Sequence, residues 1–358
     1  MNIVYVYYDH PQDRLSFEWQ CAIPAKAINR TQRHSAHLLS LKDFINNTSQ
    51  AQLLCESADV IVIHRRLIGA VLSTVQKWKA YDKKILLNLD TPVNTLTKEM
   101  PAYSFWYKGI TACQNGDCIF GDEPLDPKPI EQLAWGLRLV DGVITPSERL
   151  SDDIGESIRC TYIPSFLDTD QYLKQTAAIH EGIVIGLGGD GNHFPGIKKS
   201  GVLQALGQVV QKRNQVQIVV FGGDQRIYDH LPVSARHKYL WPMIEQADWP
   251  RYLSRLDIGL APLSGDFDQR SGSARLLEYM VMKIPWIGSE SSVYRKFSQY
   301  GWLVPNSSDA WEKVILEMVD HLQDYRVEAA AEPYLYALSN DIDENINTIL
   351  MAYENMGL

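Results

Sequence analysis

The sequence predicts an α/β protein with two doubly wound domains, each built on a parallel β-sheet. Short apolar runs rich in valine and isoleucine recur along both halves of the chain, and most are followed by a stretch with helical spacing of apolar residues. Runs that are apolar at consecutive positions are typical of parallel strands buried on both faces. A chain of 358 residues is long enough for two domains of this kind.

The first half carries the apolar runs of one sheet. The expected strands are 3–8, 36–41, 60–64, 84–89, 142–145 and 160–163. The region 93–129 lacks a clear period, so we expect a long irregular insertion there. It holds an aromatic cluster that is either a platform for sugar rings or lipid tails, or a hydrophobic cluster that pins the loop: Tyr103, Phe105, Trp106 and Tyr107.

The second half repeats the alternation of strands and helices. The expected strands are 183–187, 216–221, 237–241, 258–263, 285–288 and 301–304. A polar stretch without periodicity, 168–182, is the expected hinge between the halves. We therefore place one domain at 1–170 and a second at 181–330.

The charge balance disfavours one class of function. The chain has 34 basic and 43 acidic residues, a formal net charge of −9, which argues against broad binding to nucleic acid through its phosphates. No apolar stretch reaches the roughly 18 residues of a membrane-spanning helix, and the N-terminus has no basic segment typical of a signal peptide. We therefore expect a cytoplasmic protein without a transmembrane segment, for which peripheral membrane contact stays open.

Cysteine and histidine spacing gives no support for a metal site. Cys113 and Cys118 are close in sequence, but a zinc site needs two more ligands with a recognisable spacing, and none is nearby. We expect two free thiols in a loop, and no metal.

The stretch 257–289 is the one around which the second half is organised. It reads as an apolar strand, a polar loop, a helix at 273–281 and the next strand. Such units place ligands at the carboxyl ends of the strands, beside the helix N-terminus. Arg275 and Glu278 lie three positions apart near the start of this helix and share one face. They are either a surface ion pair or groups that meet a ligand with anionic and hydroxyl parts, such as a nucleotide-diphosphate sugar.

A glycine loop follows the first strand of the second half. Gly186, Gly188 and Gly191 satisfy the spacing G-x-G-x-x-G. A dinucleotide site wants an acidic residue roughly 20 positions on, whereas Asp224 lies 33 positions past Gly191, so we reject a nicotinamide or flavin site. A glycine loop before a helix still exposes backbone N–H groups to an anion, and Lys198 lies in the first turns of that helix.

Polar side chains close two strands of the first half, at the edge where ligands bind in an open α/β sheet. His64 ends the strand 60–64 and is followed by Arg65 and Arg66, an arginine pair suited to phosphate or carboxylate. Asp90 follows the strand 84–89. Asp90 and His64 are the candidate catalytic residues, with a helix or turn cap as the alternative for Asp90. The loop after the first strand adds candidate acceptor contacts, unless it is simply solvated: Asp9, His10, Arg14 and Ser16.

Several residues of 257–289 stand in the order of a known signature: Asp257, Pro262, Glu278, Tyr279, Met280, Lys283 and Pro285. With them, the stretch resembles the C-terminal signature of the large retaining family of GT-B glycosyltransferases (family 4-like, glycosyl transferases group 1). The resemblance implies two Rossmann-like domains facing a cleft, the first on the acceptor side and the second on the donor side. It also implies that the last helices, within 331–358, return to the first domain.

In that family the helix glutamate, here Glu278, binds the ribose hydroxyls of the donor nucleotide, and the glycine loop receives its diphosphate. The chain departs from the pattern twice. Arg270 stands where a second glutamate is usual, with Asp266 or Asp268 as candidate substitutes, and Gly189 occupies the place of an arginine. The candidate donor-binding residues are Gly188, Gly189, Gly191, Asn192, His193, Lys198, Arg270, Ser273, Arg275 and Glu278.

The function so implied is transfer of a sugar from a UDP- or GDP-sugar to a glycan, a lipid-linked sugar or a small molecule. The resemblance implies retention of anomeric configuration without a metal, and no cofactor other than the nucleotide-sugar co-substrate. Two alternatives stay open. One is a nucleotide-sugar epimerase of the same fold, and the other is a non-catalytic module that binds a nucleotide sugar.

Overall fold

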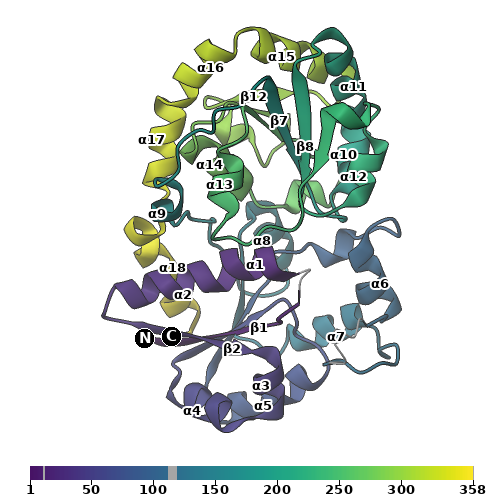
Figure 1. Cartoon of the computed structure of the whole chain (residues 1–358). Coiled ribbons are helices and arrows are strands. Elements are labelled where there is room, and N and C mark those ends of the chain that lie inside the picture. The colour runs from purple at the N-terminus through teal and green to yellow at the C-terminus, as the bar shows by residue number, and fades with distance from the viewer. Residues whose placement is uncertain (11–12, 112–118, 358) are drawn as a thin grey trace. The chain divides into compact units, whose positions relative to one another are not determined.

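The computed structural model describes residues 1–10, 13–111 and 119–357 (Figure 1). Cys113 and Cys118 lie outside the described residues. The chain divides into two compact units. Unit 1 comprises Met1–Phe166, Arg270–Gly272 and Ile342–Leu358, and unit 2 comprises Leu167–Gln269 and Ser273–Asp341.

Unit 1 is built on an all-parallel sheet of six strands in the order β2-β1-β3-β4-β5-β6. Because β2 lies on one side of β1 and β3 on the other, the order reverses between β1 and β3, which makes this a topological switch point. The strands are β1 (Asn2–Tyr7), β2 (Ser35–Ser40), β3 (Val60–His64), β4 (Lys84–Asn88), β5 (Gly142–Thr145) and β6 (Cys160–Tyr162).

Helices flank the sheet of unit 1. Its core joins β1, β3 and β4 to the last helix, since Tyr5 and Tyr353 are fully buried or nearly so and their hydroxyls hydrogen-bond at 2.8 Å. In Figure 1 this last helix, α18, lies beside α2. The helices are α1 (Arg14–Phe17), α2 (Ile23–Arg30), α3 (Leu41–Asn46), α4 (Ser49–Ser57), α5 (Ala70–Ala80), α6 (Pro101–Lys108), α7 (Pro129–Gly136), α8 (Glu148–Gly155) and α18 (Ile342–Gly357), with a 3₁₀ turn at Val93–Thr95.

A π-helical segment, Glu18–Ala22, joins α1 to α2. The cause lies in the sequence, because Pro24 has no N–H to donate and its ring crowds the carbonyl four residues earlier. Widening the helix by one residue before a proline relieves that clash. The carbonyl of Gln20 accepts instead from Asn88 Nδ2 at 3.4 Å, which ties this segment to the end of β4.

The region 93–129 is less irregular than its sequence suggests. The aromatic cluster lies on a helix, α6, which begins at Pro101 and ends before Gly109 in the left-handed conformation. Phe105 and Trp106 face Arg66, whose guanidinium carbon lies 4.5 and 5.8 Å from their ring centroids. Tyr103 and Tyr107 stack on each other at 4.7 Å. Four aromatic residues within five positions, 103–107, hide the helical period, which is why the helix was missed.

Unit 2 has a second all-parallel sheet of six strands, in the order β12-β11-β10-β7-β8-β9. Its switch point lies between β7 and β10, which are neighbours in the sheet although they are far apart in sequence. The strands are β7 (Ile183–Gly188), β8 (Val216–Phe221), β9 (Lys238–Leu240), β10 (Ile258–Ala261), β11 (Trp286–Ser289) and β12 (Trp302–Val304).

The core of unit 2 forms where α11 and α15 pack together over the sheet, with Leu206 and Trp311 fully buried. The remaining helices are shorter and connect the strands. The helices are α9 (Thr169–Tyr172), α10 (Phe194–Ser200), α11 (Val202–Lys212), α12 (Gln225–His230), α13 (Trp249–Leu253), α14 (Ala274–Val281), α15 (Ser308–Asp320), α16 (Leu322–Ala329) and α17 (Glu332–Ser339), with 3₁₀ turns at Ala235–His237, Asp268–Arg270 and Arg295–Phe297.

Asp257, the first residue of the signature, links three elements of unit 2. It is 3% exposed, accepts a hydrogen bond from the N–H of Val184 at 2.7 Å, and pairs with Arg326 of α16. The carboxylate thus joins the start of β10 to β7 and to a helix.

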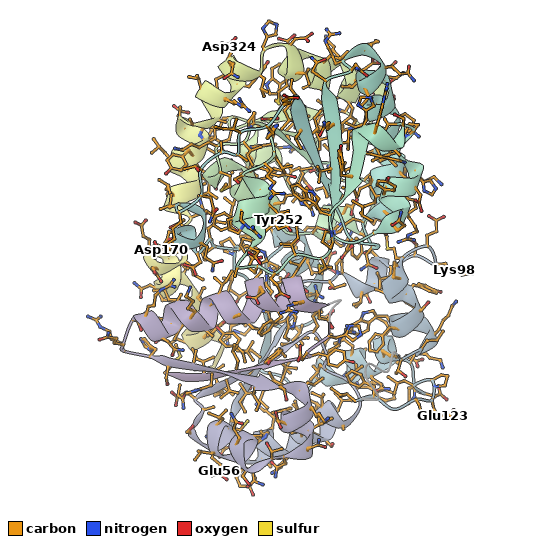
Figure 2. The ribbon with its side chains drawn as sticks, in the orientation of Figure 1. Glu56, Lys98, Glu123, Asp170, Tyr252 and Asp324 are labelled. Carbon is orange, nitrogen blue, oxygen red and sulfur yellow. The ribbon has the colours of Figure 1, made fainter. Side chains whose placement is uncertain are left out.

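We expect Asp257→Ala to lower the free energy of unfolding of unit 2 by about 2 kcal/mol, because it leaves a strand N–H and a guanidinium without their acceptor. Urea denaturation checks this. Asp324→Asn, on the exposed side of α16 (Figure 2), is the matched control and is expected to change the stability by less than about 0.5 kcal/mol. An equal loss in both variants would contradict the assignment of Asp257.

Candidate functional site

Helix α14 places Glu278 in the interior of unit 2. The helix follows β10 and a loop, and its N-cap, Ser273, makes no side-chain capping bond. Leu276, Leu277 and Met280 are buried along with Glu278, which is only 7% exposed. A buried carboxylate is costly unless it is hydrogen-bonded, so its partners show what the position is for.

Both partners of Glu278 reach the same carboxylate oxygen. Oε1 accepts a hydrogen bond from the hydroxyl of Tyr172 at 2.9 Å and from Nε1 of Trp249 at 2.8 Å. Gln246 Nε2 donates in turn to the Tyr172 hydroxyl at 3.2 Å. Within the described parts of the chain, nothing hydrogen-bonds Oε2. The site therefore orients Glu278 through one oxygen and leaves the other as an acceptor.

Burial raises the pKa of Glu278 to about 7, although Tyr172, Arg275 and Trp249 each oppose the shift. A buried carboxyl that titrates near neutrality is a common property of functional sites. The surface ion pair considered from the sequence is not formed, since Glu278 is buried and Arg275 binds elsewhere.

Arg275 holds the glycine loop. Its Nη1 donates to the carbonyl of Gly188 at 2.6 Å, and its guanidinium carbon lies 5.7 Å from the ring centroid of Phe221. The other guanidinium donors make no hydrogen bond to a described residue. Arg275 therefore shapes the end of β7 and keeps donors for a ligand.

Close packing explains the glycines of the loop. A Cβ on Gly188 would lie 2.0 Å from the ring of Phe221, and one on Gly189 would lie 2.5 Å from Ile197. An arginine at position 189 would therefore require the side chain of Ile197 to shift. Instead, Arg226 Nη2 donates to the carbonyl of Gly191 at 2.8 Å.

Most backbone donors of the loop are already used. The N–H of Gly189 donates to the carbonyl of Phe221 at 3.1 Å. The N–H groups of Asn192 and His193 donate to Asp190 Oδ1 at 2.8 and 3.2 Å. This differs from the open row of donors that the sequence suggested for an anion. Positive charge for a ligand at this loop must therefore come mainly from side chains.

His193 is the cation candidate with a buried partner. Its Nδ1 lies 2.7 Å from Oδ1 of Asp268, a carboxylate that is 1% exposed and accepts from the N–H of Ser264 at 2.8 Å. Burial lowers the pKa of His193, but the carboxylates of Asp190 and Asp268 outweigh it, so the pKa lies above its ordinary value.

The strand order explains why these groups meet. The glycine loop follows β7 and the loop with Asp268 follows β10, and the two strands are adjacent and parallel at the switch point. Ligands of open α/β sheets bind at the carboxyl ends of strands at such a point. Glu278, Arg275 and His193 are thus arranged around the ligand-binding edge of unit 2.

Two other predicted donor residues are Lys198 and Arg270. Lys198 is exposed on α10 and makes no hydrogen bond or ion pair with a described residue. Arg270 belongs to unit 1, where it pairs with Asp153. A donor-binding role for Arg270 stays a prediction.

The sequence analysis did not identify a cluster of aromatic side chains at this site. Phe221 lies 4.9 Å from Trp249 and 6.3 Å from Trp241 between ring centroids, and Trp241 lies 5.1 Å from Tyr252. Tyr252 is labelled on α13 in Figure 2. The density of aromatic residues in 239–252 was the available signal. Tyr172 gave none, because it lies in the segment expected to be a hinge.

Unit 1 gathers a charged cluster at its own switch point. Asp13 Oδ1 pairs with Arg65 at 2.8 Å and its Oδ2 with Arg66 at 2.5 Å. Arg65 also donates to Asp90 through two nitrogens. The Ser16 hydroxyl bonds Asp90 and lies 2.7 Å from His64 Nε2. The cluster therefore combines the ends of β1, β3 and β4.

Burial and the neighbouring arginines fix the protonation states of His64 and Asp90 at neutral pH. Burial lowers the pKa of His64 to about 4, and the Arg65 charge adds to this, so His64 is neutral at neutral pH. Burial favours the neutral form of Asp90, but Arg65 outweighs it and lowers its pKa. Catalytic roles for Asp90 and His64 stay a prediction.

Of the loop candidates, His10 stacks on Tyr8 at 5.3 Å and Asp9 is exposed.

The described residues contain no group of three or more His, Cys, Asp or Glu side chains placed to hold a metal ion. In the same residues, no helix combines the length and apolar character needed to cross a bilayer.

No protein-family model matches the chain, and no curated protein matches its sequence. Solved structures do match. HepE from Anabaena in complex with UDP and glucose has a TM-score of 0.63 at 13% identity, over 99% of each chain. Sucrose-phosphate synthase from Thermosynechococcus elongatus has a TM-score of 0.62 at 11% identity, over 99% of this chain and 98% of that one.

A third match is a protein assigned as a UDP-N-acetylglucosamine 2-epimerase from Listeria monocytogenes. Its TM-score is 0.56 at 9% identity, over 98% of this chain and 95% of that one. Identities this low show the fold alone. The chain has the GT-B fold, with two Rossmann-like domains, each on a six-stranded parallel sheet.

Proposed function

We propose that the chain is a glycosyltransferase whose unit 2 binds a nucleotide-diphosphate sugar and whose unit 1 receives the acceptor. The observation that carries the proposal is Glu278. It is buried, oriented through one oxygen by Tyr172 and Trp249, and keeps the second oxygen as an acceptor at the switch point. An acceptor oxygen on the same helix as Arg275, at the sheet edge that also holds His193, suits a ligand that has hydroxyls next to a diphosphate.

The chemistry needs charge stabilisation more than a protein nucleophile. When the anomeric C–O bond breaks, negative charge collects on the departing diphosphate, and fixed cations stabilise it. Arg275 and His193 would supply those cations without a metal, and the nucleotide sugar is the one co-substrate that the proposal requires. We propose a retaining reaction from the signature around Glu278. The acceptor is a glycan, a lipid-linked sugar or a small molecule.

The matched structures support UDP as the first nucleotide to try, since HepE is described with UDP, glucose and UDP-glucose. Epimerisation is the second candidate, favoured by the epimerase-like structural match. It needs a carboxylate basic enough to take a proton from a sugar carbon. Arg65 lowers the pKa of Asp90, and Arg65 and Arg66 lower that of Asp13, so neither carboxylate of the unit 1 cluster is a strong base, which favours the transferase.

Thermal shift with a panel of UDP- and GDP-sugars tests the proposal. A ligand at one hundred times its Kd stabilises the folded protein by about 2.7 kcal/mol, which raises Tm by several degrees. Arg213→Gln, on the surface of unit 2, removes a cation away from the site and should keep the full shift.

The products separate the alternatives. Incubating the bound nucleotide sugar without an acceptor should give slow release of nucleotide and free sugar. Formation of an epimer would favour the second candidate. Absence of any nucleotide-sugar binding would overturn the proposed function.

A further inference from the structure

Asp268 is a buried carboxylate with a function that its surroundings suggest. It is fixed by the N–H of Ser264 on Oδ2 and by His193 on Oδ1. Helix α10 packs so closely against it that a Cβ on Gly196 would lie 1.9 Å from its Oδ2. The loop after β10 therefore places the carboxylate of Asp268 against the imidazole of His193, which belongs to the loop after β7.

The second ring nitrogen of His193, Nε2, is the one that can bind a ligand. Nδ1 of His193 is occupied by Asp268, whereas Nε2 has no hydrogen bond to any residue that the structure describes. The side chain is 26% exposed, so Nε2 is accessible to a ligand. The nearby arginines, Arg226 and Arg275, each donate a hydrogen bond to a backbone carbonyl of the glycine loop.

The groups around His193 favour a positive charge on it. Asp190 faces it from its own loop, Asp268 from the turn after β10, and Arg275 from α14. The edge of the Phe267 ring packs at 5.3 Å. Two carboxylates against one guanidinium leave the imidazolium favoured, and a bound diphosphate would strengthen that preference.

We propose that Asp268 is a positioning residue that orients and charges His193, so that the Nε2–H of His193 binds the diphosphate of the donor. This inference rests on the proposed function and adds a property to it. Affinity for a nucleotide sugar should depend on the proton of His193, so it should fall as the pH rises past the titration of that residue.

Calorimetric titration with UDP-glucose between about pH 6 and pH 9 tests the proposal, because a nucleotide sugar has no phosphate group that titrates in this range. Glu278, with a pKa of about 7, titrates in the same range, so the contribution of His193 is the difference between the wild-type profile and that of His193→Gln. For the wild type we expect affinity to fall about tenfold or more over the alkaline part of the range. His193→Gln should remove this fall. His193→Arg should keep the affinity high at alkaline pH, because a guanidinium stays charged.

Asp268→Asn supplies the readout that separates positioning from a merely structural role. It should move the midpoint of the fall to lower pH, because the imidazolium loses its carboxylate partner. His230→Gln is the matched control, since this exposed histidine of α12 bonds the carbonyl of Arg226 and should leave the profile unchanged.

Each outcome decides the matter. An alkaline fall that is as large in His193→Gln as in the wild type, or an Asp268→Asn profile that is uniformly weaker with an unchanged midpoint, would overturn the inference while leaving the proposed function intact. If the wild type binds no nucleotide sugar at any pH, the proposed function and the inference fail together. If Asp268→Asn does not fold, the two His193 variants still test whether the proton of His193 binds the diphosphate, because His193 is partly exposed.

Discussion

Glu278→Gln is expected to stabilise unit 2 at alkaline pH by about 3 kcal/mol. The pKa of Glu278 rises from an ordinary value of 4.5 to about 7, and each pKa unit corresponds to about 1.4 kcal/mol. A raised carboxyl pKa means that the folded state holds the proton more tightly. Its stabilising contribution is complete below pH 4.5 and is lost as the pH rises through about 7. Glutamine resembles the protonated form and loses nothing.

Urea denaturation at about pH 5 and about pH 8.5 measures this effect, since the two proteins should be similar in stability at the first and differ at the second. Glu317→Gln on α15 is the control, because Glu317 is about half exposed and its change should stay within about 0.5 kcal/mol. Equal stability of Glu278→Gln and the wild type at both pH values would mean that the buried carboxyl titrates normally.

The same change should weaken binding of UDP-glucose by about tenfold to a hundredfold, because it replaces a charged acceptor at Oε2 with an amide donor. A substitution that stabilises the fold and weakens binding is the pattern of a residue retained for function. If Glu278→Gln bound the nucleotide sugar as tightly as the wild type, the assignment of Glu278 to the ribose would be wrong.

The strands of both sheets were predictable because buried parallel strands leave runs of apolar residues, as in Val60–His64 and Val216–Phe221, which the structure reproduces at both ends. The order of the strands in the sheet was not predictable in the same way. That β7 lies next to β10 depends on the tertiary fold. The pairing of His193 with Asp268 could therefore not be predicted from the sequence, where the two residues are 75 positions apart.

The functional site was predictable in part for the same reason. Glu278 and Arg275 are adjacent on one helix face and could be singled out by spacing. Tyr172 and Trp249, which orient Glu278, lie at the end of the short helix α9 and at the start of the short helix α13. Only the density of aromatic residues in 239–252 marks Trp249, and nothing in its local sequence marks Tyr172. Arg270 is a candidate donor contact because it stands where a second glutamate is usual, and its ion pair with Asp153, 117 positions away, could not be predicted from the sequence.

The charged cluster of unit 1 should depend on Asp13 more than on any exposed carboxylate. Asp13→Ala is expected to lower the free energy of unfolding of unit 1 by about 3 to 5 kcal/mol, because it leaves two largely buried arginines without their shared partner. Arg65 adds to the loss, since its φ of +58° lies in the left-handed region and its ion pairs hold it there.

Urea denaturation followed by a probe of unit 1 checks the value, with Asp9→Ala as the control from the same loop, since Asp9 is exposed. The pKa of Asp13 is lowered because the two arginines outweigh its burial. Its contribution is therefore complete above the ordinary pKa of 3.8 and is lost only as the pH falls further. The difference between Asp13→Ala and the wild type should accordingly persist from neutral pH down to about pH 4 and shrink below it. A loss of less than about 1 kcal/mol at neutral pH would mean that water, and not Asp13, satisfies Arg65 and Arg66.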